Sequence, residues 1–258
     1  MTDTIRTDLL SNKTILITRP VGREKHLRLL IEQTGGLVIH YPVITIQPLP
    51  EPAIEQLKHS FDQLHGFTMA IFISRTAVEQ SRIYFPVLPE HLTIVSIGSK
   101  TTEALKQQNI HIDIEAPDHN TESLLQTAEF QIPQIQGQQV LIFRGAGGRA
   151  LLGDTLKSRG AHIHYVETYK REMPANAPLT NQQIKTLDAI TISSNEGLEN
   201  LISLMHGPDL LIDIPLIMPS LRTAALARQY GFKTIIPAQN ATDEAILAAL
   251  NGYFSSSH

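Results

Sequence analysis

Residues 138–160, QQVLIFRGAGGRALLGDTLKSRG, contain the pattern that decides the fold. A short apolar run, 139–143, leads into a glycine-rich turn, and a helical stretch, 149–159, follows and ends at Gly160. Short apolar runs bounded by polar residues are typical of buried parallel strands, and glycine is a common stop after a helix. The stretch therefore predicts a strand, a tight turn and a helix.

The glycine turn also matches the outline of a dinucleotide-binding fingerprint. Gly145, Gly147 and Ala150 spell G-x-G-x-x-A, and Glu167 follows about twenty residues later, as that fingerprint requires. The context is only half met, because the next strand continues through TYKRE instead of turning into a second helix. A tight turn, or a close approach of backbone to a ligand, is the favoured interpretation, and an NAD-dependent oxidoreductase remains an alternative.

The strand–turn–helix unit occurs twice in the chain. TILIT, residues 14–18, begins the other copy, in which Arg19 aligns with Arg144 and Gly35 with Gly160, both 125 positions apart. Three further pairs follow in the same order: Ser74 with Ser193 or Ser194, Ser99 with Ser220, and Thr121 with Thr242. Matches in one order at nearly constant offset indicate an internal duplication.

Strands that alternate with helices predict an α/β fold: two similar domains, each with a parallel sheet flanked by helices. In such folds ligands gather at the carboxyl ends of the strands, where the repeated Arg, Ser and Thr residues are expected. Each Ser or Thr has a simpler interpretation as a helix N-cap. Together, several helix N-termini would suit a ligand with many carboxylates.

Composition excludes several classes of function. The 258 residues are 42% hydrophobic and 18% charged with a net charge of −4, which fits a folded protein and gives no basic surface for nucleic acid. Cysteine is absent, and the 11 histidines lack metal-ligand spacing, so no metal site is expected. The N-terminus has no signal-peptide core, and the longest apolar run, 210–218, is too short to cross a membrane. We expect a cytoplasmic protein with no membrane contact.

A series of short motifs lies between about residues 13 and 250, and their order and spacing are specific although each one is short. They are ILITRP, FISRTAV, IGSKTTEAL, TESLL, LIFRGAGGRALLGDTLKSRGA, ETYKREMP, ISSNEGLENL and ATDEAILAAL. In these motifs the chain resembles the uroporphyrinogen-III synthases. One departure is MPSLRTAAL, which lacks the glycine found at Gly98 in the first half.

The resemblance implies a domain arrangement in which the chain crosses between domains. Residues 1–38 plus 172–258 would form the first α/β domain and 44–165 the second, joined by a two-stranded connector at about 37–46 and 163–171. It also implies an enzyme of porphyrin, tetrapyrrole and heme biosynthesis, a hydro-lyase that uses no cofactor. That enzyme cyclises hydroxymethylbilane to uroporphyrinogen III with loss of water and inversion of ring D. Two alternatives remain, the oxidoreductase and a non-catalytic two-domain anion-binding protein.

The resemblance implies a catalytic role for Tyr169 near the leaving hydroxyl, because tyrosine is a legitimate general acid. The alternative is a packing tyrosine at a strand end whose hydroxyl lies in water. The candidate substrate-binding residues are Arg19, Ser74, Arg75, Thr76, Ser99, Lys100, Thr101, Thr121, Ser123, Arg144, Gly145, Arg149, Ser193, Ser194, Asn195, Ser220, Arg222 and Thr242. We expect a monomer that receives hydroxymethylbilane, handed over from the upstream bilane-forming enzyme.

Overall fold

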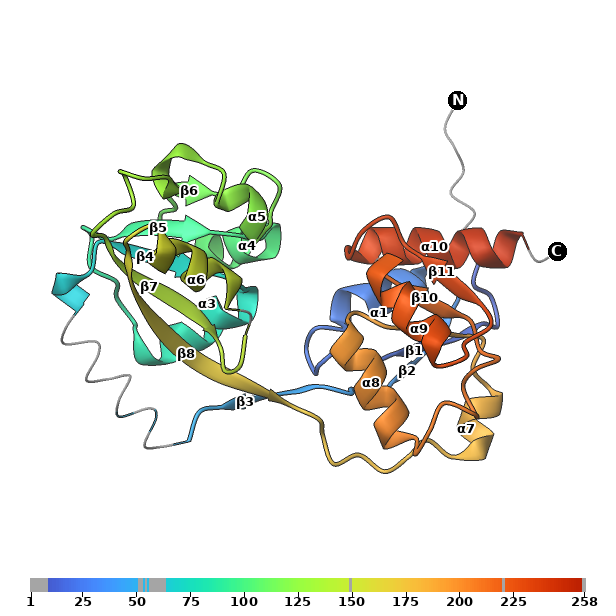
Figure 1. Ribbon diagram of the computed structural model, residues 1–258. Coiled ribbons are helices and arrows are strands. Elements are labelled where there is room, and N and C mark those ends of the chain that lie inside the picture. The colour runs from blue at the N-terminus through green and yellow to red at the C-terminus, as the bar shows by residue number, and fades with distance from the viewer. Residues whose placement is uncertain are drawn as a thin grey trace. The chain divides into compact units, whose positions relative to one another are not determined.

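The computed structural model describes residues 9–50, 53, 55, 64–148, 150–219 and 221–256, with only the backbone of Leu221 and Arg222. The chain divides into two compact units, each shown in Figure 1. Unit 1 comprises residues 1–45 and 172–258, and unit 2 comprises the continuous segment 46–171. Unit 2 is thus an insertion within the sequence of unit 1.

Unit 1 is built around a five-stranded sheet with the order β11-β10-β9-β1-β2. All four strand pairs are parallel. Its strands are β1 (Thr14–Ile17), β2 (Leu37–His40), β9 (Ala189–Thr191), β10 (Leu216–Met218) and β11 (Ile235–Pro237). Its helices are α1 (Lys25–Gln33), α7 (Asn181–Lys185), α8 (Asn195–Leu204), α9 (Leu221–Gln229) and α10 (Asp243–Ser255).

Unit 2 is built around a six-stranded sheet with the order β3-β8-β7-β4-β5-β6. The strands from β8 to β6 are parallel to one another. They are β3 (Thr45–Pro48), β4 (Met69–Phe72), β5 (Thr93–Ser96), β6 (Ile114–Glu115), β7 (Gln139–Gly145) and β8 (His162–Glu172). The helices are α3 (Arg75–Tyr84), α4 (Ser99–Gln107), α5 (Thr121–Leu124) and α6 (Leu151–Ser158), with short 3₁₀ turns at Leu64–Gly66 and Ala128–Phe130.

The two sheets repeat one topology. The order β2-β1-β9-β10-β11 in unit 1 matches β8-β7-β4-β5-β6 in unit 2, strand for strand. Gly22 and Gly147 follow equivalent strands, both with positive φ (84° and 70°), a conformation that glycine adopts without strain. Parallel sheets flanked by helices, and the duplication behind them, are as the sequence predicts.

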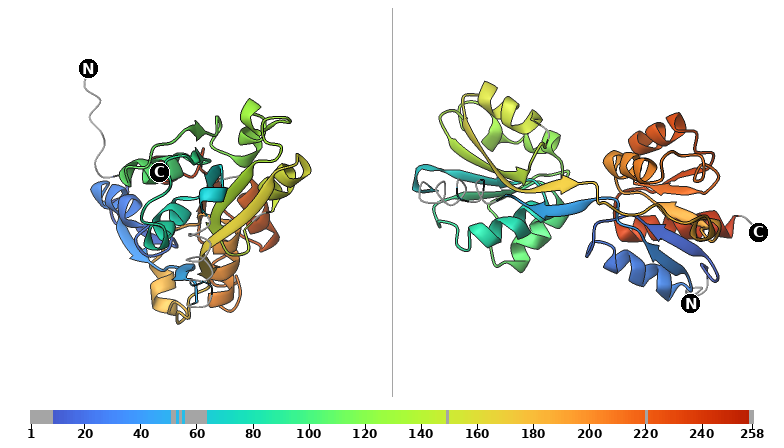
Figure 2. Two further views of the ribbon diagram at one scale, coloured as in Figure 1. Left: turned by 90° about the vertical axis from the view of Figure 1, so that its left-hand side faces the viewer. Right: turned by 90° about the horizontal axis from the view of Figure 1, so that it is seen from below.

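The core of unit 2 follows from the alternation of side chains along its strands. Ala70 and Phe72 point to one face, where they pack with residues of α3 and α4. Met69 and Ile71 point to the other face, where they pack with residues of α5 and α6. Successive residues of a strand point to opposite faces, so an unbroken apolar strand needs helices on both sides. Figure 2 shows these helices on either side of the sheet.

The core of unit 1 is formed in the same way. Ile15 and Ile17 of β1 pack with α1 and α10. These two residues, and Leu27 and Ile31 of α1, are each 0% exposed. Glycine stops α1 as predicted: Gly35 follows the C-cap Thr34 with a φ of 83°, a left-handed conformation that favours glycine. A Cβ at the next residue, Gly36, would lie 2.7 Å from the Ile31 side chain. The close approach of the β1–α1–β2 backbone therefore depends on that glycine.

The expected connector segment 37–46 is not one strand. It divides into β2 and the start of β3, because Pro42 lacks an N–H group to continue the ladder. Tyr41–Ile44 is instead held within unit 1: Asn176 Nδ2 donates to the Pro42 carbonyl (2.8 Å), and Asn200 Nδ2 donates to the Val43 carbonyl (2.9 Å). By contrast, β8 is continuous over His162–Glu172, as its sequence predicts.

Two of the predicted helix caps are wrong. The N-cap of α4 is Gly98 and that of α5 is Asn120, so Ser99 and Thr121 are each the first residue of their helix. The Asn120 side chain accepts from the Ser123 N–H (2.7 Å), and asparagine is among the strongest N-caps. The predicted caps of α3, α8 and α10 are present: Ser74, Ser194 and Thr242 each accept a backbone N–H three residues later.

Candidate active site

The topology marks one place in each unit where a ligand would bind. In unit 2 the chain leaves β4 towards β5 on one side and leaves β7 towards β8 on the other. In unit 1 the connections after β1 and β9 diverge in the same manner. Ligands of open α/β sheets bind beside such diverging connections, at the carboxyl ends of the strands. We name these positions, after β4 and β7 and after β1 and β9, the unit 2 site and the unit 1 site.

The unit 2 site is shaped by an irregularity in the pairing of β7 with β8. Arg144 pairs with Glu167, but the next residue, Gly145, pairs with Tyr169, so Thr168 is an extra residue in β8. Thr168 and Tyr169 are consequently both buried, at 0% and 2% exposed, although neighbours on a regular strand point to opposite faces. The bulge directs the Tyr169 ring towards β7 and the start of α3.

Gly145 makes room for that ring. A Cβ at position 145 would lie 2.7 Å from Tyr169 Cζ and 3.1 Å from its hydroxyl oxygen. The Ala146 N–H donates to the Tyr169 carbonyl (2.7 Å), which holds the two strand ends together. Gly145 therefore serves the placement of Tyr169.

The Tyr169 hydroxyl lies 3.2 Å from Ser74 Oγ. Ser74 is also the N-cap of α3, and its Oγ accepts the Ala77 N–H (3.1 Å). Ser74 is half-buried, whereas the tyrosine is buried. The packing part of the alternative agrees with the structure, because Tyr169 belongs to the core cluster of unit 2. The side chain does not lie in open water: it is turned inward onto Ser74 and is 2% exposed.

The remaining glycines of the turn also have local reasons. A Cβ at Gly148 would lie 2.6 Å from the Arg144 guanidinium, and Gly147 has positive φ and donates its N–H to Glu167 Oε1 (3.3 Å). The Arg144 side chain is only 6% exposed and stacks on the Tyr165 ring at 4.6 Å. The glycine pattern is therefore explained by packing around Arg144 and Tyr169, and a dinucleotide is not needed to account for it.

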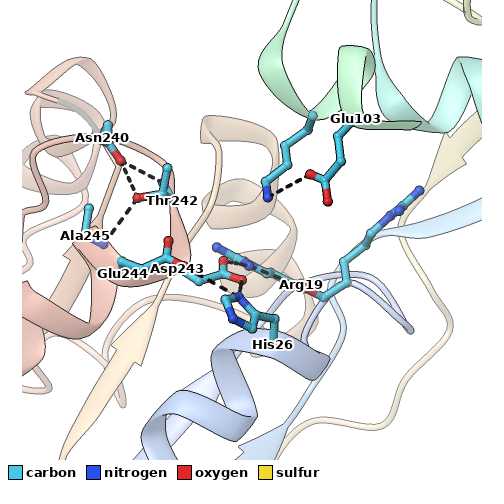
Figure 3. A network of polar contacts seen from close by, with 10 residues as sticks. Arg19, His26, Glu103, Asn240, Thr242, Asp243, Glu244 and Ala245 are labelled. Carbon is cyan, nitrogen blue, oxygen red and sulfur yellow. Dashed lines mark hydrogen bonds and ion pairs between the residues drawn. The ribbon is translucent and has the colours of Figure 1, made fainter. Parts of the chain in front are cut away.

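The unit 1 site has a different chemistry, centred on Asp243 at the first turn of α10 (Figure 3). Arg19, directly after β1, forms an ion pair with one carboxylate oxygen of Asp243, and His26 Nδ1 lies 2.8 Å from the other. The Arg19 and Asp243 side chains are 13% and 15% exposed. The predicted ligand arginine is thus already paired within unit 1.

A second carboxylate, Glu24, lies near the start of α1. Its side chain is 11% exposed, and Oε2 is 3.9 Å from His40 Nε2, which contacts the Arg19 carbonyl at 2.8 Å. Burial alone would raise the pKa of Glu24. The backbone N–H groups of Glu24 and Gly22, together with His40 and Arg28, outweigh burial and hold that pKa below its usual value. Glu24 is therefore a buried carboxylate that stays ionised.

The two sites differ at the position of the tyrosine. The 125-residue offset that aligns Arg19 with Arg144 places Ile44 opposite Tyr169 and Pro20 opposite Gly145. Ile44 is 6% exposed and lies near Gly197, whose N–H donates to the cap Ser194. Both sites keep a serine cap at this place, but only the unit 2 site combines it with a phenol.

Several other candidate residues are engaged locally. Arg75 Nε is 2.8 Å from Glu79 within α3, and Lys100 Nζ is 3.2 Å from Glu103 within α4. Both pairs lie near the protein surface. Thr101 and Ser123 are buried, at 3% and 6% exposed, and face their own unit. Thr76, Ser193 and Asn195 are half-buried beside the caps of α3 and α8. Arg149, Ser220 and the side chain of Arg222 lie outside the described residues.

Sequence reasoning missed Asp243, Glu24 and the bulge at Thr168. Asp243 follows the good N-cap residue Thr242, so the sequence indicates only an acidic residue that stabilises the first turn of a helix. The sequence signal for the bulge is the apolar alternation of Ile163 and Tyr165, which Val166 interrupts. In the structure the burial along β8 changes phase over residues 166–169. Among the described residues no group of three or more His, Asp or Glu side chains is placed to hold a metal ion, and no helix is long and apolar enough to cross a membrane.

Comparison with known proteins agrees with the topology and the motifs. The family model described as uroporphyrinogen-III synthase HemD matches residues 25–248. Uroporphyrinogen-III synthase of Escherichia coli strain K12 is 32% identical over 249 residues, covering 92% of this chain and 99% of the relative. The enzyme of Salmonella typhimurium is 31% identical over 250 residues, with the same coverage.

A mutant uroporphyrinogen III synthase from Thermus thermophilus shares the fold, with a TM-score of 0.61. It is 16% identical, and the match covers 95% of this chain and all of that one. With two full-length relatives above 30% identity and a family model that spans most of the sequence, the chain belongs to the uroporphyrinogen-III synthase family.

Proposed function

We propose that this protein cyclises hydroxymethylbilane to uroporphyrinogen III, with loss of water and inversion of ring D. Family membership supports the reaction. The observation that carries the proposal within the molecule is the contact of Tyr169 with Ser74, because it places an acidic hydroxyl beside a helix N-terminus in one of two otherwise repeated sites.

The chemistry asks little of the protein. The hydroxymethyl carbon loses its oxygen as water when a proton is supplied, and the electrons of the pyrrole stabilise the cation that remains. Closure then depends on which carbon of ring D is held next to that cation, so catalysis is mainly positioning. Tyr169 is the proposed source of the proton.

We assign substrate carboxylates to the helix starts of both units. The α3, α4, α8 and α10 N-termini carry partial positive charge and side chains that donate hydrogen bonds. The residues proposed to contact substrate are Ser74, Arg75, Thr76, Ser99, Lys100, Ser193, Ser194, Asn195 and Thr242. Arg19 and Arg144 are assigned a supporting role, since Asp243 and the stack on Tyr165 already hold them.

The same proposal includes the domain division expected from the family. It also includes a cytoplasmic monomer that receives hydroxymethylbilane directly from the upstream bilane-forming enzyme. Light scattering coupled to size-exclusion chromatography checks the monomer. The handover is checked by coupling this protein to the upstream enzyme and adding an excess of an inactive variant of this protein, which binds bilane released into solution. Type III product that persists despite the competitor supports handover.

The direct test is an isomer assay. Freshly made hydroxymethylbilane is mixed with the protein, and the oxidised product is separated by chromatography. We expect the type III isomer with the protein and the type I isomer, from spontaneous closure, with heat-denatured protein. Type I product in both samples would refute the proposal.

A further inference from the structure

We propose that Ser74, rather than Tyr169 itself, delivers the proton to the leaving hydroxyl, as the outer member of a two-hydroxyl relay. This inference rests on the proposed function and refines the role of two residues within it. Its basis is the difference in burial between two hydroxyls that are 3.2 Å apart.

The hydrogen bond between the two residues can run in either direction. A serine hydroxyl has one proton and two lone pairs, and the Ala77 N–H already uses one lone pair of Ser74 Oγ. If Ser74 donated to Tyr169, the phenol proton would need another acceptor in a place where the ring is 2% exposed. Among the described residues, Ser74 is the hydrogen-bond partner of that phenol.

The opposite direction satisfies every atom. Tyr169 donates to Ser74 Oγ, which accepts twice, and the serine proton is then free to point towards the half-buried side of the residue. The less buried hydroxyl is thus the one able to meet a substrate. Two accepted hydrogen bonds also polarise the serine O–H and make it a better donor.

The proton transfer balances. The serine O–H proton moves to the substrate hydroxyl, the carbon–oxygen bond breaks, and water leaves. The phenol proton moves to Ser74 Oγ in the same step, so the serine is neutral throughout and Tyr169 is left as a phenolate. The N-terminus of α3, with the Ala77 N–H aimed at Ser74, stabilises this negative charge. The proton released when ring D closes the macrocycle returns the phenolate to phenol.

The duplicated site supports this assignment. Ser194 has the same capping contact in unit 1, with Gly197 N–H at 3.0 Å, but the residue opposite is Ile44. Both units therefore have a serine N-cap at this position, Ser74 or Ser194. The site of unit 2 differs in having the Tyr169 hydroxyl in contact with its serine.

Substitutions at position 74 separate capping from proton delivery. Ser74→Thr keeps the cap and the hydroxyl, Ser74→Asn keeps a strong cap acceptor but has no hydroxyl, and Ser74→Ala loses both. Thr180→Ala is the matched control: Thr180 caps α7 through Gln183 N–H and lies away from both sites, so it removes a cap alone. Each variant is first checked by circular dichroism and thermal melting.

Single-turnover rates with enzyme in excess are then measured. We expect Ser74→Thr to stay within about threefold of wild type and Thr180→Ala to be unchanged. Ser74→Asn and Tyr169→Phe should each slow closure about 100-fold, the low end for a general acid, because catalysis is mainly positioning. Tyr169→Phe combined with Ser74→Asn should be no slower than either alone, because members of one relay are not additive. In mixtures of light and heavy water, the wild-type rate should curve with deuterium fraction, as two moving protons require.

The outcomes are distinct. A wild-type protein without type III product refutes the proposed function itself. A wild-type protein with type III product and a Ser74→Asn variant at the wild-type rate refutes the relay alone. Multiplying effects in the double variant, or a straight deuterium plot for the wild type, would show that the two hydroxyls act separately.

Discussion

Gly145→Ala tests whether the bulge and its glycine hold Tyr169 in place. The added Cβ would lie 2.7 and 2.8 Å from two ring carbons of Tyr169 and 3.1 Å from its hydroxyl oxygen, far inside normal contact. Tyr169 is 2% exposed and belongs to the core cluster that includes Phe143 and Val166, so a shift of its ring must displace buried neighbours. Overpacking of this kind costs about 1–3 kcal/mol, and we expect the upper half of that range.

The expected loss corresponds to a fall in melting temperature of about 2–4 °C per kcal/mol, or about 4–12 °C for the transition of unit 2. Displacing the ring should also break the hydrogen bond to Ser74 and slow closure at least as much as Tyr169→Phe does. Thermal melting by circular dichroism and the single-turnover isomer assay measure both effects.

Gly66→Ala is the matched control, since Gly66 is exposed in the same unit and a Cβ there meets nothing within 4 Å. Its effect should be within about 0.5 kcal/mol. A double-mutant cycle with Tyr169→Ala isolates the clash, because removing the ring should recover most of the cost of Gly145→Ala. A Gly145→Ala protein that melts within about 1 °C of wild type and closes the bilane at the wild-type rate would refute the reasoning.

Three further predictions concern stability. Gly252→Ala in α10, where a Cβ meets nothing within 4 Å, should raise the free energy of unfolding by about 0.5–1 kcal/mol in urea titrations, and a loss would contradict it. Asp243→Asn leaves Arg19, 13% exposed, without its ionic partner and should cost about 1–3 kcal/mol, whereas Asp213→Asn in an exposed pair should cost under about 1 kcal/mol. The folded-state pKa of Glu24 is lowered, so its contribution should be complete above its usual pKa of 4.5 and be lost as pH falls below. Urea titrations of wild type and Glu24→Gln should therefore differ most at neutral pH and approach each other as the pH falls below 4.5, and a difference in stability that grows in acid would contradict the prediction.

The parts of the fold that follow from local pattern could be predicted. Apolar runs such as 139–143 are long enough and rich enough in β-branched residues to specify buried strands. The offset of 125 residues between Arg19 and Arg144, repeated between Gly35 and Gly160, indicates the duplication. Both depend on sequence spacing alone, and both agree with the strand order of the two sheets.

The details of the site could not be predicted, because they depend on contacts across long sequence separations. Ser74 meets Tyr169 across 95 residues, and Arg19 meets Asp243 across 224. Hydrophobic periodicity predicts which residues face a core. It does not predict which residues from different strands lie together at one end of a sheet. The cap at Asn120 was missed for a smaller reason, since Asn-Thr offers two good cap residues in a row and only the backbone chooses between them.

The insertion of unit 2 within unit 1 sets an order of events during synthesis. Strands β1 and β2 leave the ribosome before unit 2, whereas the other parallel neighbour of β1, strand β9, emerges only after the whole of unit 2 has been translated. At ~5–20 residues per second this delay is on the order of ten seconds, long enough for unit 2, which is one continuous segment, to fold alone. Ile15, Leu16 and Ile17, all 0% exposed in the finished protein, remain without their core during that interval. The nascent chain therefore carries an apolar β1–α1–β2 segment that has not yet packed against β9. A chaperone that binds this segment would protect the chain most at this stage.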